Sequence, residues 1–233
     1  MNGSGRCEQR HTPIEESIWL PRGAYRRTDI DGPQGCRYRD GVTQASHTLW
    51  RWPRAEYDRL VSLGVFEDAP IELIGGQLLV AEPQGAYHAS AVGVVDYALR
   101  AVLPPGWTVR LQAPLALDEE SEPEPDVAVV PGRPSDYRTA HPARPALAVE
   151  VAESSLAFDR AQKGSLYARA GIVDYWIVNL VDRCLEVYRD PEPDASATYG
   201  WRYRSVAVME PGATVAPLAC PAASPIAVAD LLP

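Results

Sequence analysis

EPDVAVV, residues 124–130, and ALAVEVAESSLAFDRAQKGSLYARAGIVDYW, residues 146–176, are the stretches that decide the fold. Each begins with or contains an apolar run of strand length. The second run leads into a segment with helical spacing and then into a further apolar run at residues 175–180. Two strands, one long helix and another strand predict a mixed β-sheet with a crossover connection. The expected fold class is therefore α/β.

The strand predicted at residues 146–153 has two different faces, because successive side chains point to opposite sides of a sheet. One face carries Leu147, Val149 and Val151, and the other carries Ala146, Ala148, Glu150 and Ala152. Small alanines leave space around the Glu150 carboxylate. Since an unpaired buried charge is very costly, Glu150 is expected to have a cation partner, either an arginine, Lys163 or a metal ion.

Lys163 is the only lysine of the chain, against 21 arginines. The two residue types are interchangeable on a solvated surface but not where a compact, deprotonatable amine is needed. Lys163 falls in a helix predicted from about Leu156 to Ala170, four positions after Asp159. An ordinary surface ion pair between Asp159 and Lys163 is the alternative interpretation.

Asp126 stands at the head of a predicted buried strand, directly after Pro125, which restricts the backbone before it. With Glu150 on the neighbouring strand, two carboxylates can converge at one place on the sheet. Such a pair suits Mg²⁺ or Mn²⁺, and a nearby lysine adds the charge stabilisation that phosphodiester hydrolysis needs. A structural ion network is the alternative. Most of the acidic residues of segment 118–124 are expected to form a solvated loop.

Two polar residues lie on neighbouring predicted elements. Gly75-Gly76 between two apolar runs predicts a β-hairpin in which Glu72 is opposite Leu79. His88 lies near the start of a helix predicted from Tyr87 to Leu103. Either residue could be structural, Glu72 as an edge-strand group in water and His88 as a helix-end hydrogen bonder.

Length and composition limit the classes of protein to which the chain can belong. The 233 residues predict a domain at residues 45–233 after a poorly structured tail at residues 1–44. The apolar runs are too short for a transmembrane helix and the start lacks a signal-peptide pattern, so no membrane association and a cytoplasmic location are expected. Four dispersed cysteines predict neither structural zinc nor a disulfide framework. The net charge of −9 gives no general attraction for nucleic acid.

The order of motifs resembles one known family. The motifs are E-L-I-x-G-x-L from Glu72, a helix headed by His88, P-D-V from Pro125, V-E-V from Val149, D-R-x-x-K from Asp159, L-Y-A-R-A-G from Leu166 and Y-W-I-V from Tyr175. In this order they resemble the Uma-two family, described as restriction endonucleases of the PD-(D/E)XK nuclease superfamily. The resemblance covers roughly residues 48–230.

This resemblance implies a restriction-endonuclease-like core, a central mixed β-sheet flanked by helices with an N-terminal β-hairpin. It implies Asp126 and Glu150 as ligands of Mg²⁺ or Mn²⁺. The superfamily lysine usually comes two residues after the glutamate, where this chain has Ala152, so Lys163 on the following helix is assigned the role. Glu72 is carried over as an accessory metal or water ligand, and His88 as a base or phosphate contact.

The expected function is that of a Mg²⁺-dependent endonuclease with DNA as substrate, acting as a homodimer so that both strands are cut. An inactive nuclease-fold protein that binds nucleic acid or protein is the alternative, and a hydrolase of small phosphate esters is a third possibility. The acidic pair and the single lysine favour cleavage, whereas the acidic isoelectric point favours the inactive form.

Overall fold

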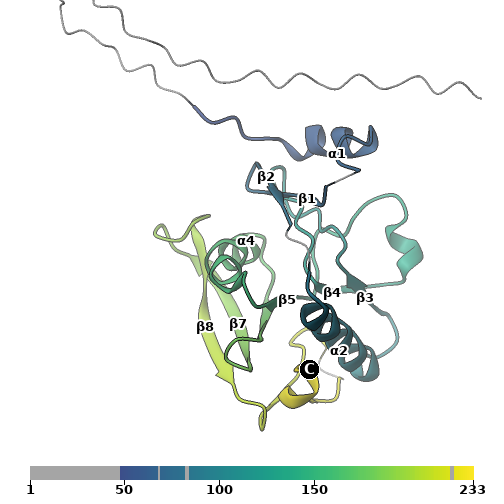
Figure 1. The fold of residues 1–233 in the computed structure, drawn as a ribbon, viewed down its shortest axis with the longest axis vertical. Coiled ribbons are helices and arrows are strands. Elements are labelled where there is room, and N and C mark those ends of the chain that lie inside the picture. The colour runs from purple at the N-terminus through teal and green to yellow at the C-terminus, as the bar shows by residue number, and fades with distance from the viewer. Residues whose placement is uncertain (1–47, 68, 82–83, 221–222) are drawn as a thin grey trace, which may run out of the picture. The chain divides into compact units, whose positions relative to one another are not determined.

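The computed structural model describes residues 48–67, 69–81, 84–220 and 223–233, and Figure 1 shows their arrangement. The tail predicted for residues 1–44 lies outside the described residues, as does the very start of the domain predicted for residues 45–233. That division stays a prediction. Within the described residues, no helix has both the length and the apolar character that crossing a membrane requires.

A six-stranded mixed sheet forms the centre of the fold, in the order β3-β4-β5-β6-β7-β8. Its strands are β3 (Trp107–Leu111), β4 (Val127–Pro131), β5 (Leu147–Ala152), β6 (Asp174–Asn179), β7 (Cys184–Pro193) and β8 (Trp201–Met209). Only β5 and β6 are parallel neighbours; all other neighbouring strands are antiparallel. A parallel pair needs a crossover, which the helical segment between β5 and β6 provides. The predicted mixed sheet with a crossover is confirmed.

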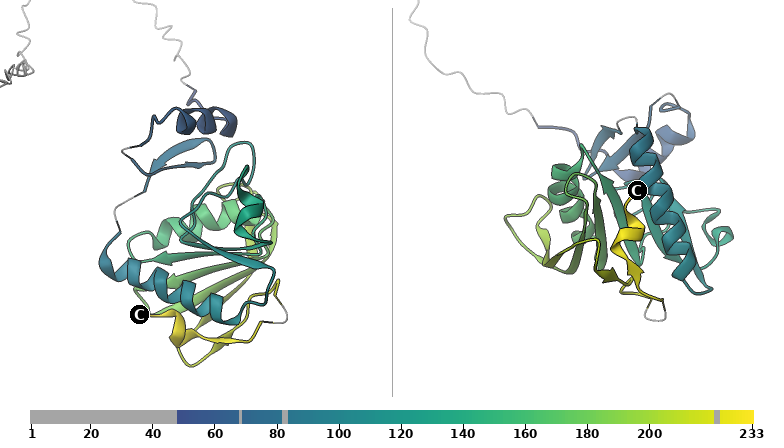
Figure 2. Two further views of the ribbon diagram at one scale, coloured as in Figure 1. Left: turned by 90° about the vertical axis from the view of Figure 1, so that its right-hand side faces the viewer. Right: turned by 60° about the horizontal axis from the view of Figure 1, so that its bottom comes forward.

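Helices cover both faces of this sheet, with α2 (Ala86–Val102) on one side and α4 (Gly164–Arg169) on the other (Figure 2). The predicted alternation of β5 decides which residues face which helix. Leu147, Val149 and Val151 join the apolar core that contains α2, whereas Ala148 and Ala152 join the core that contains α4. The small side chains therefore lie on the face that also carries Glu150.

The predicted hairpin is present as β1 (Ile71–Ile74) and β2 (Gln77–Val80), with Glu72 opposite Leu79. Gly75 and Gly76 have φ values of 55° and 77°, the left-handed conformation that glycine adopts at little cost. The hairpin forms its own two-stranded sheet and is joined to the domain by an antiparallel bridge between Leu73 and Glu122.

The connection between β5 and β6 differs from the single regular helix predicted from Leu156 to Ala170. It consists of α3 (Leu156–Phe158), a π-helical turn (Asp159–Lys163) and α4. The Asp159 carbonyl accepts two hydrogen bonds, one from the Gly164 amide and one from the Tyr175 hydroxyl at 3.0 Å. Since a π turn contains one residue more than an α turn, it rotates Lys163 relative to Asp159.

The acidic segment 118–124 is less solvated than its composition predicted: Glu119 is exposed, but Glu122 is not. Ser121 and Glu122 are buried, and the Glu122 amide donates to the Leu73 carbonyl at 2.7 Å. The expectation failed because the hairpin packs onto this segment, a contact between parts of the chain distant in sequence.

The remaining elements complete the two sides of the domain. They are α1 (Arg54–Ser62), a 3₁₀ turn (Pro134–Tyr137), the short antiparallel pair β9 (Thr214–Val215) and β10 (Ile226–Ala227), and a final 3₁₀ turn (Val228–Leu231). The last three follow β8 and pack on the α2 side, where Val215, Ile226 and Val228 enter the core.

Candidate active site

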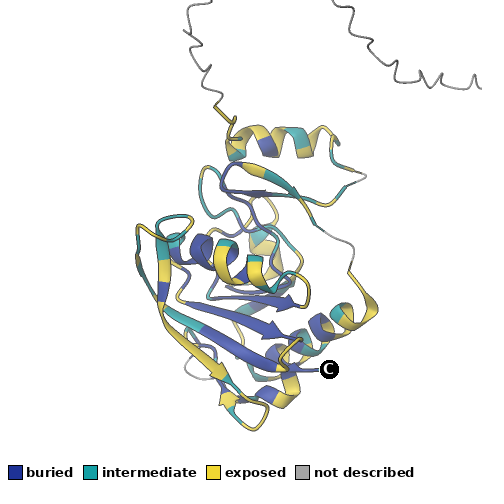
Figure 3. Cartoon of the chain, turned by 60° about the vertical axis from the view of Figure 1, so that its left-hand side comes forward, coloured by how far each residue is buried: buried dark blue, intermediate teal, exposed yellow. Residues whose placement is uncertain are grey.

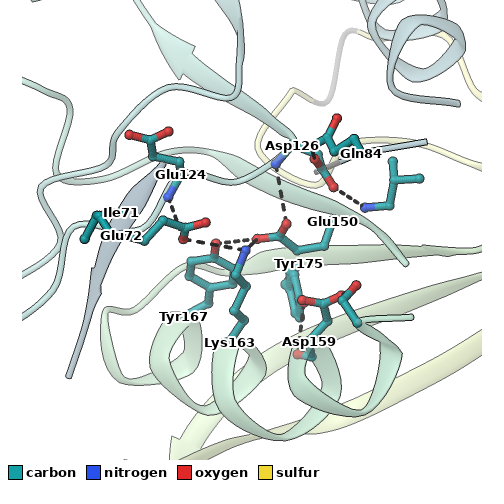
Figure 4. Close-up of polar contacts among 12 residues, drawn as sticks. Ile71, Glu72, Gln84, Glu124, Asp126, Glu150, Asp159, Lys163, Tyr167 and Tyr175 are labelled. Atoms are coloured by element: carbon teal, nitrogen blue, oxygen red, sulfur yellow. Dashed lines mark hydrogen bonds and ion pairs between the residues drawn. The ribbon is translucent and has the colours of Figure 1, made fainter. Parts of the chain in front are cut away.

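A cleft of about 800 Å³ opens between the hairpin, the start of α2, the sheet and the π-helical turn. All five residues singled out from the sequence line it: Glu72, His88, Asp126, Glu150 and Lys163. They come from five separate segments of the chain, so the fold is what brings them together. Figure 4 shows polar contacts of four of them, Glu72, Asp126, Glu150 and Lys163.

Asp126 is fixed by contacts from three directions. Its Oδ2 accepts a hydrogen bond from the Val151 amide at 2.8 Å, and its Oδ1 lies 3.1 Å from His88 Nε2 and 3.3 Å from Gln84 Nε2. The start of β4 thus holds the carboxylate over β5. Asp126 is buried apart from 7% of its surface, and its exposed part faces the cleft.

Glu150 has two differently occupied oxygens. Oε1 lies 3.0 Å from Lys163 Nζ and accepts a hydrogen bond from the Tyr167 hydroxyl at 2.6 Å. Oε2 lies 3.4 Å from the Asp126 amide nitrogen. Lys163 and Tyr167 therefore both contact Oε1, whereas Oε2 is directed toward the backbone of Asp126, the second carboxylate residue.

Lys163 is buried and contacts Glu150, with Glu72 Oε2 further away at 3.8 Å. The surface ion pair with Asp159 is not formed: Asp159 is itself buried and its Oδ2 accepts from the Ser155 hydroxyl. Within the described residues, the ion pairs of Lys163 are with Glu150 and Glu72 only. The π turn explains this change of partner.

Glu72 faces the cleft from the hairpin. Its Oε2 accepts a hydrogen bond from the Glu124 amide at 3.1 Å, which fixes the carboxylate beside Lys163. Glu72 is thus a partly buried group of the cleft and not an edge-strand residue in water.

Three residues of the cleft network were not predicted from the sequence as site residues: Gln84, Glu124 and Tyr167. Tyr167 had a detectable signal, because it follows Lys163 by four positions and so lies on the same helical face. Gln84 and Glu124 lie in irregular segments whose side-chain directions no periodicity predicts.

The cleft is buried and carries an excess of negative charge, and three of its carboxyl groups have raised pKa values. Burial raises the pKa of Glu150 to about 8; Lys163 and Tyr167 oppose that shift, while Asp159 and Asp126 add to it. Burial also raises the pKa of Glu124 and of Asp159.

The two basic residues respond to the same field. Burial alone would lower the pKa of Lys163, but Glu150, Glu72 and Asp159 together raise it well above its ordinary value. The hydrogen bond to Asp126 raises the pKa of His88, against the effect of burial. Lys163 is therefore a protonated group, suited to stabilising negative charge and not to accepting a proton.

The donor set fits a hard divalent cation. Asp126 and Glu150 offer carboxylate oxygens on adjacent strands, in a cleft whose acidic groups outnumber its basic ones. Within the described residues, no three histidine, cysteine, aspartate or glutamate side chains are arranged to hold a metal ion. A cation here would have two protein carboxylates and complete its shell with water, as Mg²⁺ commonly does.

Comparison with known proteins agrees with this architecture. The chain is similar to the crystal structure of a protein from Anabaena variabilis described as a putative nuclease belonging to DUF820. The TM-score is 0.50 at 18% sequence identity, covering 69% of this chain and 88% of the other. The fold is thus an α/β fold shared with that protein.

The sequence itself defines the family. A model of the Uma2 family, described as "Putative restriction endonuclease", matches residues 54–229. The chain belongs to the Uma2 family, as its motifs indicated. No curated protein matches it.

Proposed function

We propose that this protein is a metal-dependent endonuclease that hydrolyses phosphodiester bonds of DNA. The observation that carries the proposal is the convergence of Asp126, Glu150 and Lys163 in one cleft. Membership of a family described as restriction endonucleases supports the reaction class, and the Anabaena variabilis protein of similar fold is described as a nuclease.

Asp126 and Glu150 would hold Mg²⁺ or Mn²⁺. When bound, the cation would supply polarisation of a phosphate oxygen and activation of a water molecule. The hydrogen bond from the Val151 amide holds Asp126 in place, and Tyr167 with Lys163 holds Glu150. The protein therefore supplies two carboxylates whose positions do not depend on the cation.

Lys163 contributes a fixed positive charge to the reaction. Its ammonium group has three donors and contacts Glu150 and, at a longer distance, Glu72. A donor directed to the scissile phosphate would stabilise the charge that develops there during attack. The raised pKa keeps the amine protonated for this role.

His88 and Glu72 have supporting roles. His88 orients Asp126 through its Nε2 contact at 3.1 Å, and in its protonated form it adds positive charge for a phosphate. Glu72 orients Lys163 and offers an oxygen to a water molecule at the edge of the cleft. DNA as the substrate and a homodimer that cuts both strands complete the proposal.

The test is incubation of purified protein with supercoiled plasmid and short duplexes, with and without Mg²⁺ or Mn²⁺. Cleavage is expected in the presence of metal and is expected to disappear in Asp126→Asn, which keeps the shape of the side chain but loses its charge. Cleavage that persists in Asp126→Asn would identify a contaminating nuclease and remove the support for the proposal.

A melting experiment separates the metal site from the substrate. Metal is expected to raise the melting temperature of the wild-type chain and not that of Asp126→Asn, since a ligand that binds the folded state stabilises it. Metal-dependent stabilisation without cleavage of any DNA would retain the site and contradict the proposed substrate.

A further inference from the structure

β8 is an edge strand with one free side. Within the described residues it pairs with β7 alone, over the register from Trp201 to Met209. Its outer backbone N–H and C=O groups are therefore available to another strand. An edge of this kind is a template for pairing with a second chain, and natural proteins commonly protect it with charges, prolines or a covering segment.

The second half of β8 lacks such protection. Residues 205–208 read Ser-Val-Ala-Val, without charge or proline, and all four are exposed. Val206 and Val208 leave 51% and 64% of their surfaces in solvent. Figure 3 shows most of this strand in the colour of exposed residues, at the rim of the sheet. Exposed β-branched residues on a free edge favour a strand as partner.

The edge is also self-complementary. A second copy related by a two-fold axis at Ala207 would pair antiparallel, so that the positions of each opposite pair add up to the same value. Val206 then lies opposite Val208 of the second copy, and Arg204 lies opposite Glu210. The symmetry repeats both pairs, and no like charges face each other.

The charged residues at the ends of this stretch are available for such pairing. Arg204 leaves 67% of its side chain exposed, and its ion pairs with other described residues are long, 3.5 Å to Asp190 and 4.0 Å to Glu192. Glu210 is exposed immediately after the strand. Arg202, in contrast, already contacts Glu192 at 2.9 Å and Asp194 at 3.3 Å.

We propose that β8 is the contact surface for a second copy of this chain, paired antiparallel about Ala207 so that the two sheets become one. Main-chain hydrogen bonds supply the attraction, the four valines exclude water, and the Arg204–Glu210 pairs fix the register. The inference does not depend on cleavage, because association is measured on the protein without substrate.

Charge exchange tests the register. Sedimentation velocity of the full chain over a concentration series is expected to show a monomer–dimer equilibrium. Arg204→Glu places like charges opposite each other twice and should weaken association about tenfold. Glu210→Arg should do the same, and the double variant Arg204→Glu/Glu210→Arg should restore the wild-type constant to within about twofold.

Arg202→Glu is the matched control, since position 202 would lie opposite Gly212, beyond the paired strand; it should change association by no more than about twofold. Circular dichroism melts establish that each variant is folded. A chain that stays monomeric at every concentration would overturn the proposal. So would a dimer whose association constant changes in neither Arg204→Glu nor Glu210→Arg, because its interface must then lie elsewhere, for instance along the exposed face of α2 around Tyr97.

Discussion

Two buried glutamates occupy one row of the central sheet and have different surroundings. Glu150 on β5 is level with Ile177 on β6, which is level with Glu186 on β7. Residues opposite each other on neighbouring strands share a face, so both carboxylates lie with Ile177 on the face of the sheet that α4 covers. Each also meets a cation from the same π-helical turn, Lys163 for Glu150 and Arg160 for Glu186.

Glu186 is fully satisfied. Arg160 binds both of its oxygens, Asn179 donates at 2.8 Å and the Tyr188 hydroxyl at 2.7 Å. Burial would raise the pKa of Glu186, but these hydrogen bonds lower it below the ordinary value. A planar guanidinium with two parallel hydrogen bonds is the usual arrangement of a structural ion pair.

Glu150 has weaker partners: Lys163 and Tyr167 contact one oxygen, and the other accepts only a long hydrogen bond of 3.4 Å from the Asp126 amide. Its pKa is raised to about 8, the opposite direction to that of Glu186. A compact ammonium on one oxygen leaves the other oxygen for a further cation. Burial and a charged partner are therefore common to both glutamates. Hydrogen bonds outweigh burial at Glu186, whereas at Glu150 burial outweighs Lys163 and Tyr167, and the charges of Asp159 and Asp126 add to the rise.

The largest effect expected from this comparison is on cleavage. Lys163→Met should lower the rate of plasmid nicking by about 100-fold, because it removes a charge directed into the cleft. Arg160→Met removes a cation whose partner Glu186 does not line the cleft, so its rate should stay within about threefold of wild type.

 The Arg160 guanidinium is bound to Glu186 outside the cleft. Both variants therefore remove one positive charge, but only Lys163→Met removes it from the cleft. Equal losses of activity in the two variants would contradict the distinction.

The free energy of unfolding should show the reverse order, with the larger loss in Arg160→Met. Arg160→Met leaves Glu186 buried with only neutral donors, and because Arg160 is itself half-exposed the cost should be about 1–3 kcal/mol in the free energy of unfolding. Lys163→Met should cost less at neutral pH, because Lys163 lowers the pKa of Glu150 and its loss lets that carboxyl stay protonated and neutral. Urea unfolding monitored by circular dichroism measures both values. A larger loss in Lys163→Met would indicate that Lys163 is chiefly a structural residue.

Much of this comparison could be predicted from the sequence. Strict alternation along β5 placed Glu150 on the face of the alanines, because the period of a strand depends only on its backbone. The glycine pair fixed the hairpin register and so the position of Glu72. The single lysine among arginines indicated Lys163.

The remaining features depend on tertiary contacts. The π turn forms where the Asp159 carbonyl meets both the Gly164 amide and the Tyr175 hydroxyl, and Tyr175 belongs to the following strand. The burial of Glu122 depends on the hairpin that packs over it. Neither contact leaves a periodic signal in the local sequence, so a helix and a solvated loop were the expected structures.

The smallest effect expected is on the pH dependence of stability without metal. The folded-state pKa of Glu150 lies above its unfolded value, so the folded chain binds more protons than the unfolded chain between those values and its stability falls as pH rises through this window. Glu186 has a lowered pKa, so its contribution changes only in acid. Between about pH 6 and about pH 8, wild-type protein should therefore lose about 2 kcal/mol through Glu150. Glu150→Gln should flatten this slope, and Glu186→Gln should leave it unchanged.

Urea titrations at a series of pH values measure the slopes directly. If both glutamine variants kept the wild-type slope, the group with the raised pKa would not be Glu150, and the contrast between the two glutamates would lose its physical basis.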